Sequence, residues 1–178
     1  MSLGDSKTLV AWQQPLLVNL TAASGLSWTR GDGGVAGSTV ASYAAAIDGI
    51  LAAFNPPNPP RVEVLMNWGA NDVGAMPAEA AWKANYLTII DAVSAKWPQA
   101  KMRLSKPWRR GYAAQCNTLA AWIDDIVAAR PGVAFVADDE RVWLENGDDG
   151  ATRTTEGVHY SAAGMSEKSA QAQTVLGY

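Results

Sequence analysis

Short apolar runs alternate with longer amphipathic segments along this chain, and this alternation constrains the fold more than any other feature. The apolar runs are Val62–Met66, Lys101–Ser105 and Val133–Val136, with shorter strands predicted at Met1–Leu3 and Ser27–Arg30. Strands that alternate with helices indicate a parallel sheet covered by helices on both faces. The sequence therefore predicts an α/β fold, and such sheets place their ligands at the carboxyl ends of the strands.

The helical segments are recognised by apolar residues at the i, i+3, i+4, i+7 spacing. This spacing predicts helices at Ala41–Phe54, Pro77–Trp97 and Ala113–Gly132, and weaker helices at Pro15–Ala23 and Ser161–Leu176. The proline pairs in residues 54–60 are read as a helix stop and a loop, not as a domain boundary. A chain of 178 residues is most simply one domain, spanning residues 1–178.

Charge and composition exclude several function classes. The net charge is −3 and the isoelectric point is about 5.1, which argues against a nucleic-acid partner because such surfaces are strongly basic. No run approaches the roughly 20 apolar residues of a membrane span. No signal peptide is visible, so the default expectation is a cytoplasmic protein, or a secreted one if residues upstream of Met1 are missing. Nothing in the sequence specifies an oligomeric state.

The chain has one cysteine, Cys116, and one histidine, His159. A single cysteine cannot form an intramolecular disulfide, and its apolar helical surroundings predict a buried thiol. A zinc site built from one histidine, one cysteine and carboxylates would be a poor ligand set, so we expect no metal. Any chemistry that uses an imidazole must use His159.

Unusual polar residues follow the predicted strands. They are Gly4-Asp5-Ser6, Gly37 in "GVAGST", Gly69-Ala70-Asn71-Asp72 in "NWGAND", and Glu156 with His159 in "TEGVHYSAAG". Acyl transfer needs a serine beside a histidine, a carboxylate that orients the imidazole, and donors for the developing oxyanion. All of these residue types are present at the predicted strand ends.

Taken in this order, the four motifs resemble those of the SGNH hydrolases, also called the GDSL esterase/lipase family. The resemblance covers essentially the whole chain and implies a three-layer α/β/α, flavodoxin-like parallel sheet of about five strands. It implies that Ser6 is the nucleophile and His159 the base. The N–H groups of Ser6 and Gly37 and the side chain of Asn71 would form the oxyanion hole. The family needs no cofactor.

The chain departs from the family pattern at three places. Glu156 stands where the family has aspartate, and Asp148 and Asp149 are alternative acids. The first strand is short or truncated, because only three residues precede Gly4. Lys7 follows the serine where an apolar residue is common, and we expect this lysine to be solvated.

These observations predict a serine esterase that hydrolyses short-chain carboxylic esters, with acetyl groups on carbohydrates as one candidate. A short chain leaves little room for a lid, which favours small acyl groups. Trp68, Val158 and Trp108 are the candidate pocket residues. The alternatives are a thioesterase or lysophospholipase, or a non-catalytic glycan-binding module on an esterase fold. A weaker alternative is a dinucleotide site, because residues 31–36 match G-x-G-x-x-A.

Overall fold

The computed structural model describes residues 1–178 except 10–11, 26, 56–58, 60 and 146–151. Its centre is a parallel sheet of five strands in the order β2-β1-β3-β4-β5. The strands are β1 (Ser2–Gly4), β2 (Asp32–Gly34), β3 (Glu63–Asn67), β4 (Lys101–Lys106) and β5 (Ala134–Asp139). The predicted three-layer α/β/α fold with about five parallel strands is confirmed.

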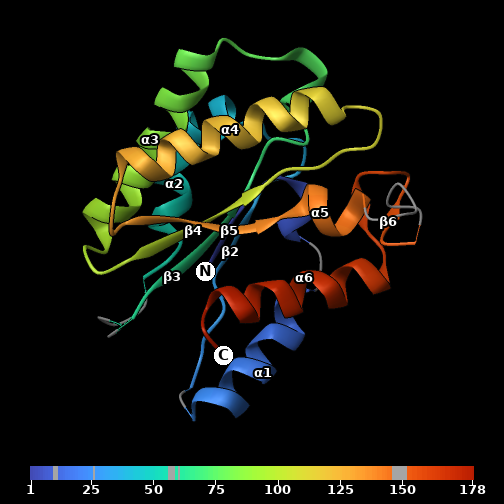
Figure 1. Ribbon diagram of the computed structural model, residues 1–178. Helices are drawn as coiled ribbons and strands as arrows, with labels where there is room; N and C mark the ends of the chain where they lie inside the picture. Colours follow the sequence, from blue (N-terminus) through green and yellow to red (C-terminus); the bar gives the residue numbers. More distant parts are fainter. Residues whose placement is uncertain (10–11, 26, 56–58, 60, 146–151) are drawn as a thin grey trace.

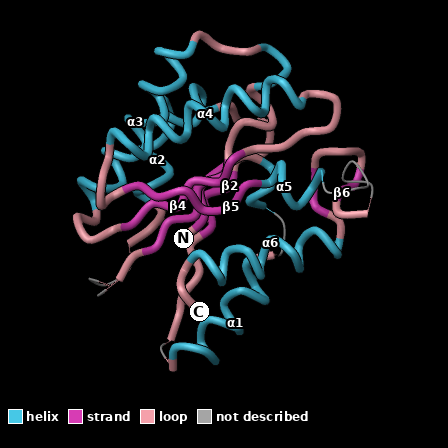
Figure 2. The backbone as a smooth tube through the Cα atoms, in the orientation of Figure 1, coloured by secondary structure: helices cyan, strands magenta, loops and turns pink. Residues whose placement is uncertain are grey.

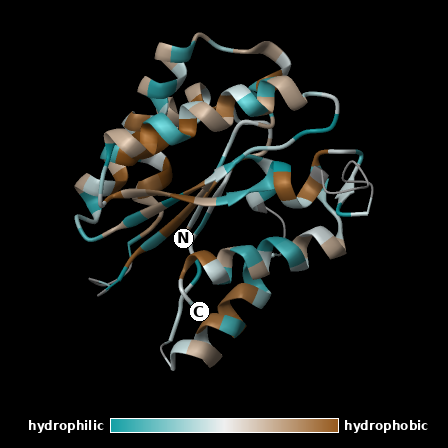
Figure 3. Ribbon diagram, in the orientation of Figure 1, coloured by the Kyte–Doolittle hydropathy of each residue, from teal (hydrophilic) through white to brown (hydrophobic). Residues whose placement is uncertain are grey.

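Helices cover both faces of this sheet (Figure 1). One layer holds α2 (Val40–Ala52), α3 (Glu79–Lys96) and α4 (Ala113–Ala129), and the other holds α1 (Gln13–Ser24) and α6 (Ala162–Val175). The strands run between the two layers (Figure 2), and hydrophobic residues lie along the central strands (Figure 3). Among the described residues, no helix is both long and apolar enough to cross a membrane.

The elements that the sequence predicted differ from the observed ones mainly at the second strand. It was expected at Ser27–Arg30 but lies at Asp32–Gly34, where two glycines and an aspartate give no apolar signal. Its pairing with β1 supplies the strand geometry that the residues themselves do not favour. Cys116 is buried in α4, as predicted.

Three short elements in the last third of the chain were not predicted. They are the short helix α5 (Glu140–Glu145), which follows β5 directly, and the strands β6 (Thr154–Thr155) and β7 (His159–Tyr160), which pair antiparallel as a hairpin. Each is shorter than the stretch over which a pattern can be recognised, about 11–18 residues for a helix and about 4–8 for a strand, so the sequence carries no clear periodic signal for it.

Candidate active site

The first three strands of the sheet end level with one another. Gly4 pairs in register with Gly34 and with Asn67, so the segments that follow these strands emerge at the same edge. A Cβ at Gly4 would lie 2.2 Å from the Asn67 carbonyl oxygen, and glycine is therefore required there. This close approach places the residues after β1 directly beside those after β3.

Ser6 and His159 meet at this edge although 153 positions separate them in the sequence. The distance from Ser6 Oγ to His159 Nε2 is 2.9 Å. Ser6 opens a 3-10 turn, η1 (Ser6–Leu9), and His159 opens β7. The structure thus brings together the two side chains that the sequence motifs single out, within the reach needed for proton transfer.

Glu156 lies on the other side of the His159 ring. Its Oε1 forms a hydrogen bond with His159 Nδ1, and hydrogen bonds from Thr155 and His159 lower the pKa of the Glu156 carboxyl. An ionised carboxylate only accepts hydrogen bonds, so Nδ1 is the donor in this bond and, in the neutral imidazole, Nε2 carries the lone pair. The Nε2 lone pair therefore faces the Ser6 hydroxyl.

Glu156 lies in the turn of the β6–β7 hairpin and has an unusual backbone conformation. Residues 156–158 connect β6 to β7, and Glu156 has a φ of 40°, which makes it the one described non-glycine residue with positive φ. This left-handed conformation is uncommon for a residue other than glycine and is typical of functional turns. The alternative acids Asp148 and Asp149 lie outside the described residues.

The predicted oxyanion residues follow the neighbouring strands. Asn71 Nδ2 donates to the Ser38 carbonyl at 3.1 Å, which fixes the amide and leaves its second N–H available. Gly37 has a φ of 71°, and a Cβ there would meet nothing within 4 Å. Among the described residues, no hydrogen bond is seen from the backbone N–H of Ser6 or Gly37.

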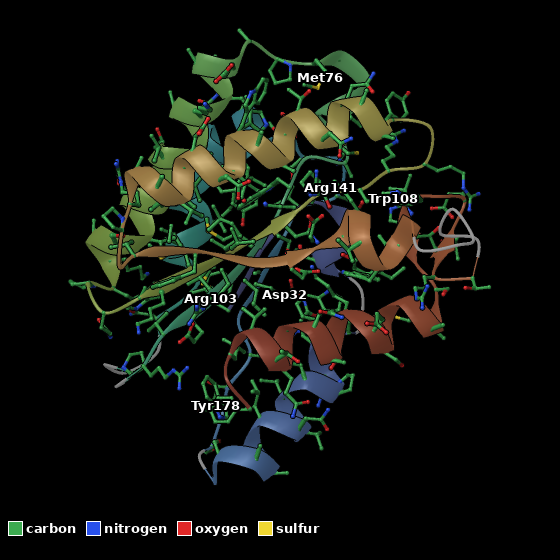
Figure 4. All side chains as sticks on the ribbon, in the orientation of Figure 1. Asp32, Met76, Arg103, Trp108, Arg141 and Tyr178 are labelled. Atoms are coloured by element: carbon green, nitrogen blue, oxygen red, sulfur yellow. The ribbon has the colours of Figure 1, made fainter. Side chains whose placement is uncertain are left out.

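Two of the three predicted pocket residues belong to the core instead. Trp68 is 0% exposed and packs between Tyr43 and Tyr86, with ring centroids 4.5 Å and 5.5 Å away. Trp108 is 1% exposed and lies beside α5 (Figure 4). These large apolar rings are buried against neighbouring helices, so they do not face a substrate. Val158 is half-buried in the hairpin turn beside His159.

The expectation of a solvated Lys7 is wrong. Its side chain is fully buried and its ammonium contacts Glu140 Oε2 at 2.6 Å and the Trp108 carbonyl at 2.7 Å. A buried ammonium is stable only with such partners. The sequence could not reveal this pair because Glu140 lies 133 positions away.

Asp5 and Asp72, next to the proposed catalytic residues, are buried, and burial raises the pKa of each carboxyl to about 6. The folded protein then holds protons between about pH 4 and pH 6 that the unfolded chain has released. The contribution of these two carboxyls to stability is therefore largest below about pH 4 and is lost as the pH rises to about 6, by at most about 1.4 kcal/mol per pH unit for each proton.

We expect Asp72→Asn to flatten this pH dependence. The asparagine can still accept from the Val40 N–H, which Asp72 binds at 3.3 Å, but it does not titrate. Urea unfolding at pH 4.5, 5.5 and 7 should show a slope smaller by up to about 1.4 kcal/mol per pH unit. Asp91→Asn, at an exposed aspartate paired with Arg130, should leave the slope unchanged. An unaltered slope in Asp72→Asn would contradict the assignment.

A cavity of about 390 Å³ lies at the opposite end of the sheet, lined by Met1, Gly31, Val62 and neighbours at the amino ends of β1, β2 and β3. Ser6 and His159 lie at the other end of the strands, so this cavity is not part of the candidate active site.

The dinucleotide interpretation of residues 31–36 is wrong, because Gly31 precedes β2 and does not follow a strand. Among the described residues, no cluster of three or more potential metal ligands is found.

A five-stranded parallel α/β/α sheet with Ser6 and His159 at its carboxyl edge defines the fold class of the SGNH hydrolases. A sequence profile of the GDSL-like lipase/acylhydrolase family matches residues 3–166. The chain therefore belongs to the GDSL-like lipase/acylhydrolase (SGNH hydrolase) family, a family of carboxylic ester hydrolases.

Solved structures share this fold at low sequence identity. An acetyl esterase crystallised with acetate ion is 20% identical with a TM-score of 0.78, covering 99% of this chain and 94% of that one. A carbohydrate esterase of family 3 from Talaromyces cellulolyticus is 20% identical with a TM-score of 0.75, covering 99% and 94%. An acetylxylan esterase from Geobacillus stearothermophilus is 16% identical with a TM-score of 0.76, covering 99% and 93%. No curated protein matches the chain.

Proposed function

We propose that this protein is a serine esterase that hydrolyses short-chain carboxylic esters, with Ser6 as nucleophile, His159 as general base and Glu156 as the orienting acid. The observation that carries the proposal is the hydrogen-bonded line from Glu156 through His159 to Ser6 Oγ. It follows the geometry that activates a serine, with the base oriented by a third group.

The reaction proceeds in two halves. Ser6 Oγ bonds to the ester carbonyl carbon as its proton passes to His159 Nε2, and the carbonyl oxygen becomes an oxyanion. Collapse of this intermediate breaks the bond to the alcohol oxygen, which takes the proton from Nε2. Water then attacks the acyl-serine with the same base, releasing the acid and restoring Ser6.

The oxyanion is stabilised by the N–H groups of Ser6 and Gly37 and by the Asn71 amide. The Asn71 donor is held before reaction by the Ser38 carbonyl, and a donor that is already in place costs no reorganisation in the transition state. Acetyl esters of carbohydrates are the substrate class we favour, supported by the acetyl and acetylxylan esterases among the structural neighbours. Thioesters and lysophospholipids are the competing substrates.

The test is labelling with a serine-directed fluorophosphonate, followed by peptide mass spectrometry, together with hydrolysis of acetyl to octanoyl nitrophenyl esters. We expect one label on Ser6 and the fastest turnover on the acetyl ester. An unlabelled and inactive protein would favour the glycan-binding alternative. Faster octanoyl than acetyl turnover would overturn the short-chain assignment.

Asn71→Ala is expected to lower kcat about 10²–10³-fold with little change in KM, because the lost donor acts mainly on the transition state. Steady-state kinetics on nitrophenyl acetate measure both constants. The matched control is Asn19→Ala on α1, where the amide donates to Gln173 Oε1 on the protein surface. Activity of Asn71→Ala within twofold of the wild type would remove this side chain from the oxyanion hole.

A further inference from the structure

One buried carboxylate lies behind the proposed active site. Glu140 opens α5 and is 0% exposed. Its oxygens accept from five donors. These are Lys7 Nζ at 2.6 Å, Asn67 Nδ2 at 2.7 Å, the Trp108 N–H at 3.2 Å, Lys168 Nζ at 3.3 Å, and the Tyr160 hydroxyl.

Three of these donors belong to the segments that carry the proposed catalytic groups. Lys7 directly follows Ser6, and Tyr160 directly follows His159. Asn67 is the last residue of β3, four positions before Asn71, and its amide also donates to the Tyr160 hydroxyl at 2.8 Å. A single carboxylate therefore joins the nucleophile segment, the base segment and the oxyanion segment.

The side chain of His159 is less buried than the residues that support it. The side chain of His159 is 42% exposed, and its strand is two residues long in a hairpin separate from the main sheet. Its neighbour Tyr160, in contrast, is 3% exposed. Since adjacent residues in a strand point to opposite faces, the buried Tyr160 fixes the backbone from which His159 reaches Ser6.

We propose that Glu140 is the positioning residue of this site: it holds the Ser6, His159 and Asn71 segments in mutual register through Lys7, Tyr160 and Asn67. This rests on the proposed esterase function. Acyl transfer needs its groups within about 0.5 Å of the productive geometry, and a displacement of about 1 Å can reduce the rate by 10². Glu140 touches no reacting atom, so it acts through the residues it binds.

The test compares Glu140→Gln and Tyr160→Phe with the matched control Asp138→Asn. Asp138 belongs to the same buried polar cluster, but its partners are Ser105, Trp143 and Lys168 and include no neighbour of a catalytic residue. Rates are divided by the folded fraction of each variant, taken from its urea unfolding curve, and are measured well below its unfolding temperature. This division removes the effect of unfolded protein.

For Glu140→Gln and Tyr160→Phe we expect kcat to fall by about 10–10² with KM within about threefold. Asp138→Asn should keep the wild-type kcat per active site even though it is less stable. A purely structural Glu140 would give the opposite result, with all three variants less stable and none altered in kcat. If Glu140→Gln does not fold, the same comparison between Tyr160→Phe and Asp138→Asn decides.

A second readout needs no turnover. His159 is the only histidine, so its ring nitrogens give an unambiguous ¹⁵N–¹H spectrum. The wild type should show the single tautomer protonated at Nδ1, and Tyr160→Phe should add a second. A wild type inert towards nitrophenyl esters would overturn the proposed function, while this spectrum would still test the positioning. An unchanged tautomer together with an unchanged kcat in Tyr160→Phe would overturn the role of Glu140.

Discussion

Ser6→Ala is expected to lower kcat for nitrophenyl acetate by about 10⁴–10⁶, because removing the nucleophile of a Ser-His-acid triad disables the whole unit. The residual rate would come from the oxyanion donors and substrate binding. The fold should be preserved, since among the described residues the one side-chain hydrogen bond of Ser6 is with His159. Unfolding free energies from urea titration should agree within about 0.5–1 kcal/mol.

The matched control is Ser94→Ala, a serine inside α3 and away from the catalytic edge of the sheet. It should retain wild-type kcat and fluorophosphonate labelling, whereas Ser6→Ala loses both. Ester hydrolysis by Ser6→Ala within tenfold of the wild type would show that another group is the nucleophile. Combining Ser6→Ala with His159→Ala should cost little more than either alone, since the two residues act as one unit.

The sheet and its main helices could be predicted from the sequence because each carries its own periodic signal. In α4, for example, Leu119, Ile123 and Ile126 repeat at helical spacing, and all three are buried. β2 has no such signal, since Asp32–Gly34 contains no apolar side chain. Its strand conformation comes from pairing with β1, which is a tertiary effect invisible in the segment itself.

Only the residues of the candidate site that belong to the recognised motifs could be predicted from the sequence. Ser6, Glu156 and His159 come together as the motifs indicate. The buried contacts behind them could not be predicted, because nothing in the sequence distinguishes Lys7, Glu140 and Lys168 from charged residues at the surface, and their partners lie far away along the chain. Trp68 shows the converse error, since its place in the "NWGAND" motif suggested a pocket but its ring packs against Tyr43.

The largest expected effect on the free energy of unfolding comes from removing one of these buried charges, the ammonium of Lys168. Lys168 is buried in α6, and its ammonium contacts Asp138 Oδ1 and Ser105 Oγ at 2.8 Å and Glu140 Oε1 at 3.3 Å. Burial alone would lower the pKa of Lys168, but the charges of Asp138 and Glu140 outweigh it and raise the pKa. Lys7, Lys168, Asp138 and Glu140 together form a buried cluster of two positive and two negative groups.

We expect Lys168→Met to lower the free energy of unfolding by about 3–5 kcal/mol at pH 7, because it leaves two buried carboxylates with one ammonium. This is a large share of the roughly 5–15 kcal/mol typical of a domain. Urea unfolding measures the loss. Lys83→Met, at an exposed pair with Glu79, should change stability by less than about 1 kcal/mol.

A double variant can separate two causes of the lost stability, the unbalanced charge and the lost packing of the lysine side chain. Burial alone would raise the pKa of Glu140. The charges of Lys7 and Lys168 outweigh this effect and lower the pKa of Glu140 to about 2. Removing Lys168 takes away one of the charges that lower the pKa of Glu140, so the deficit of Lys168→Met should shrink as the pH falls towards 4. Lys168→Met/Asp138→Asn should recover part of it at pH 7, since the cluster is again balanced. A deficit independent of pH and unrelieved by Asp138→Asn would instead assign the loss to packing of the lysine stem.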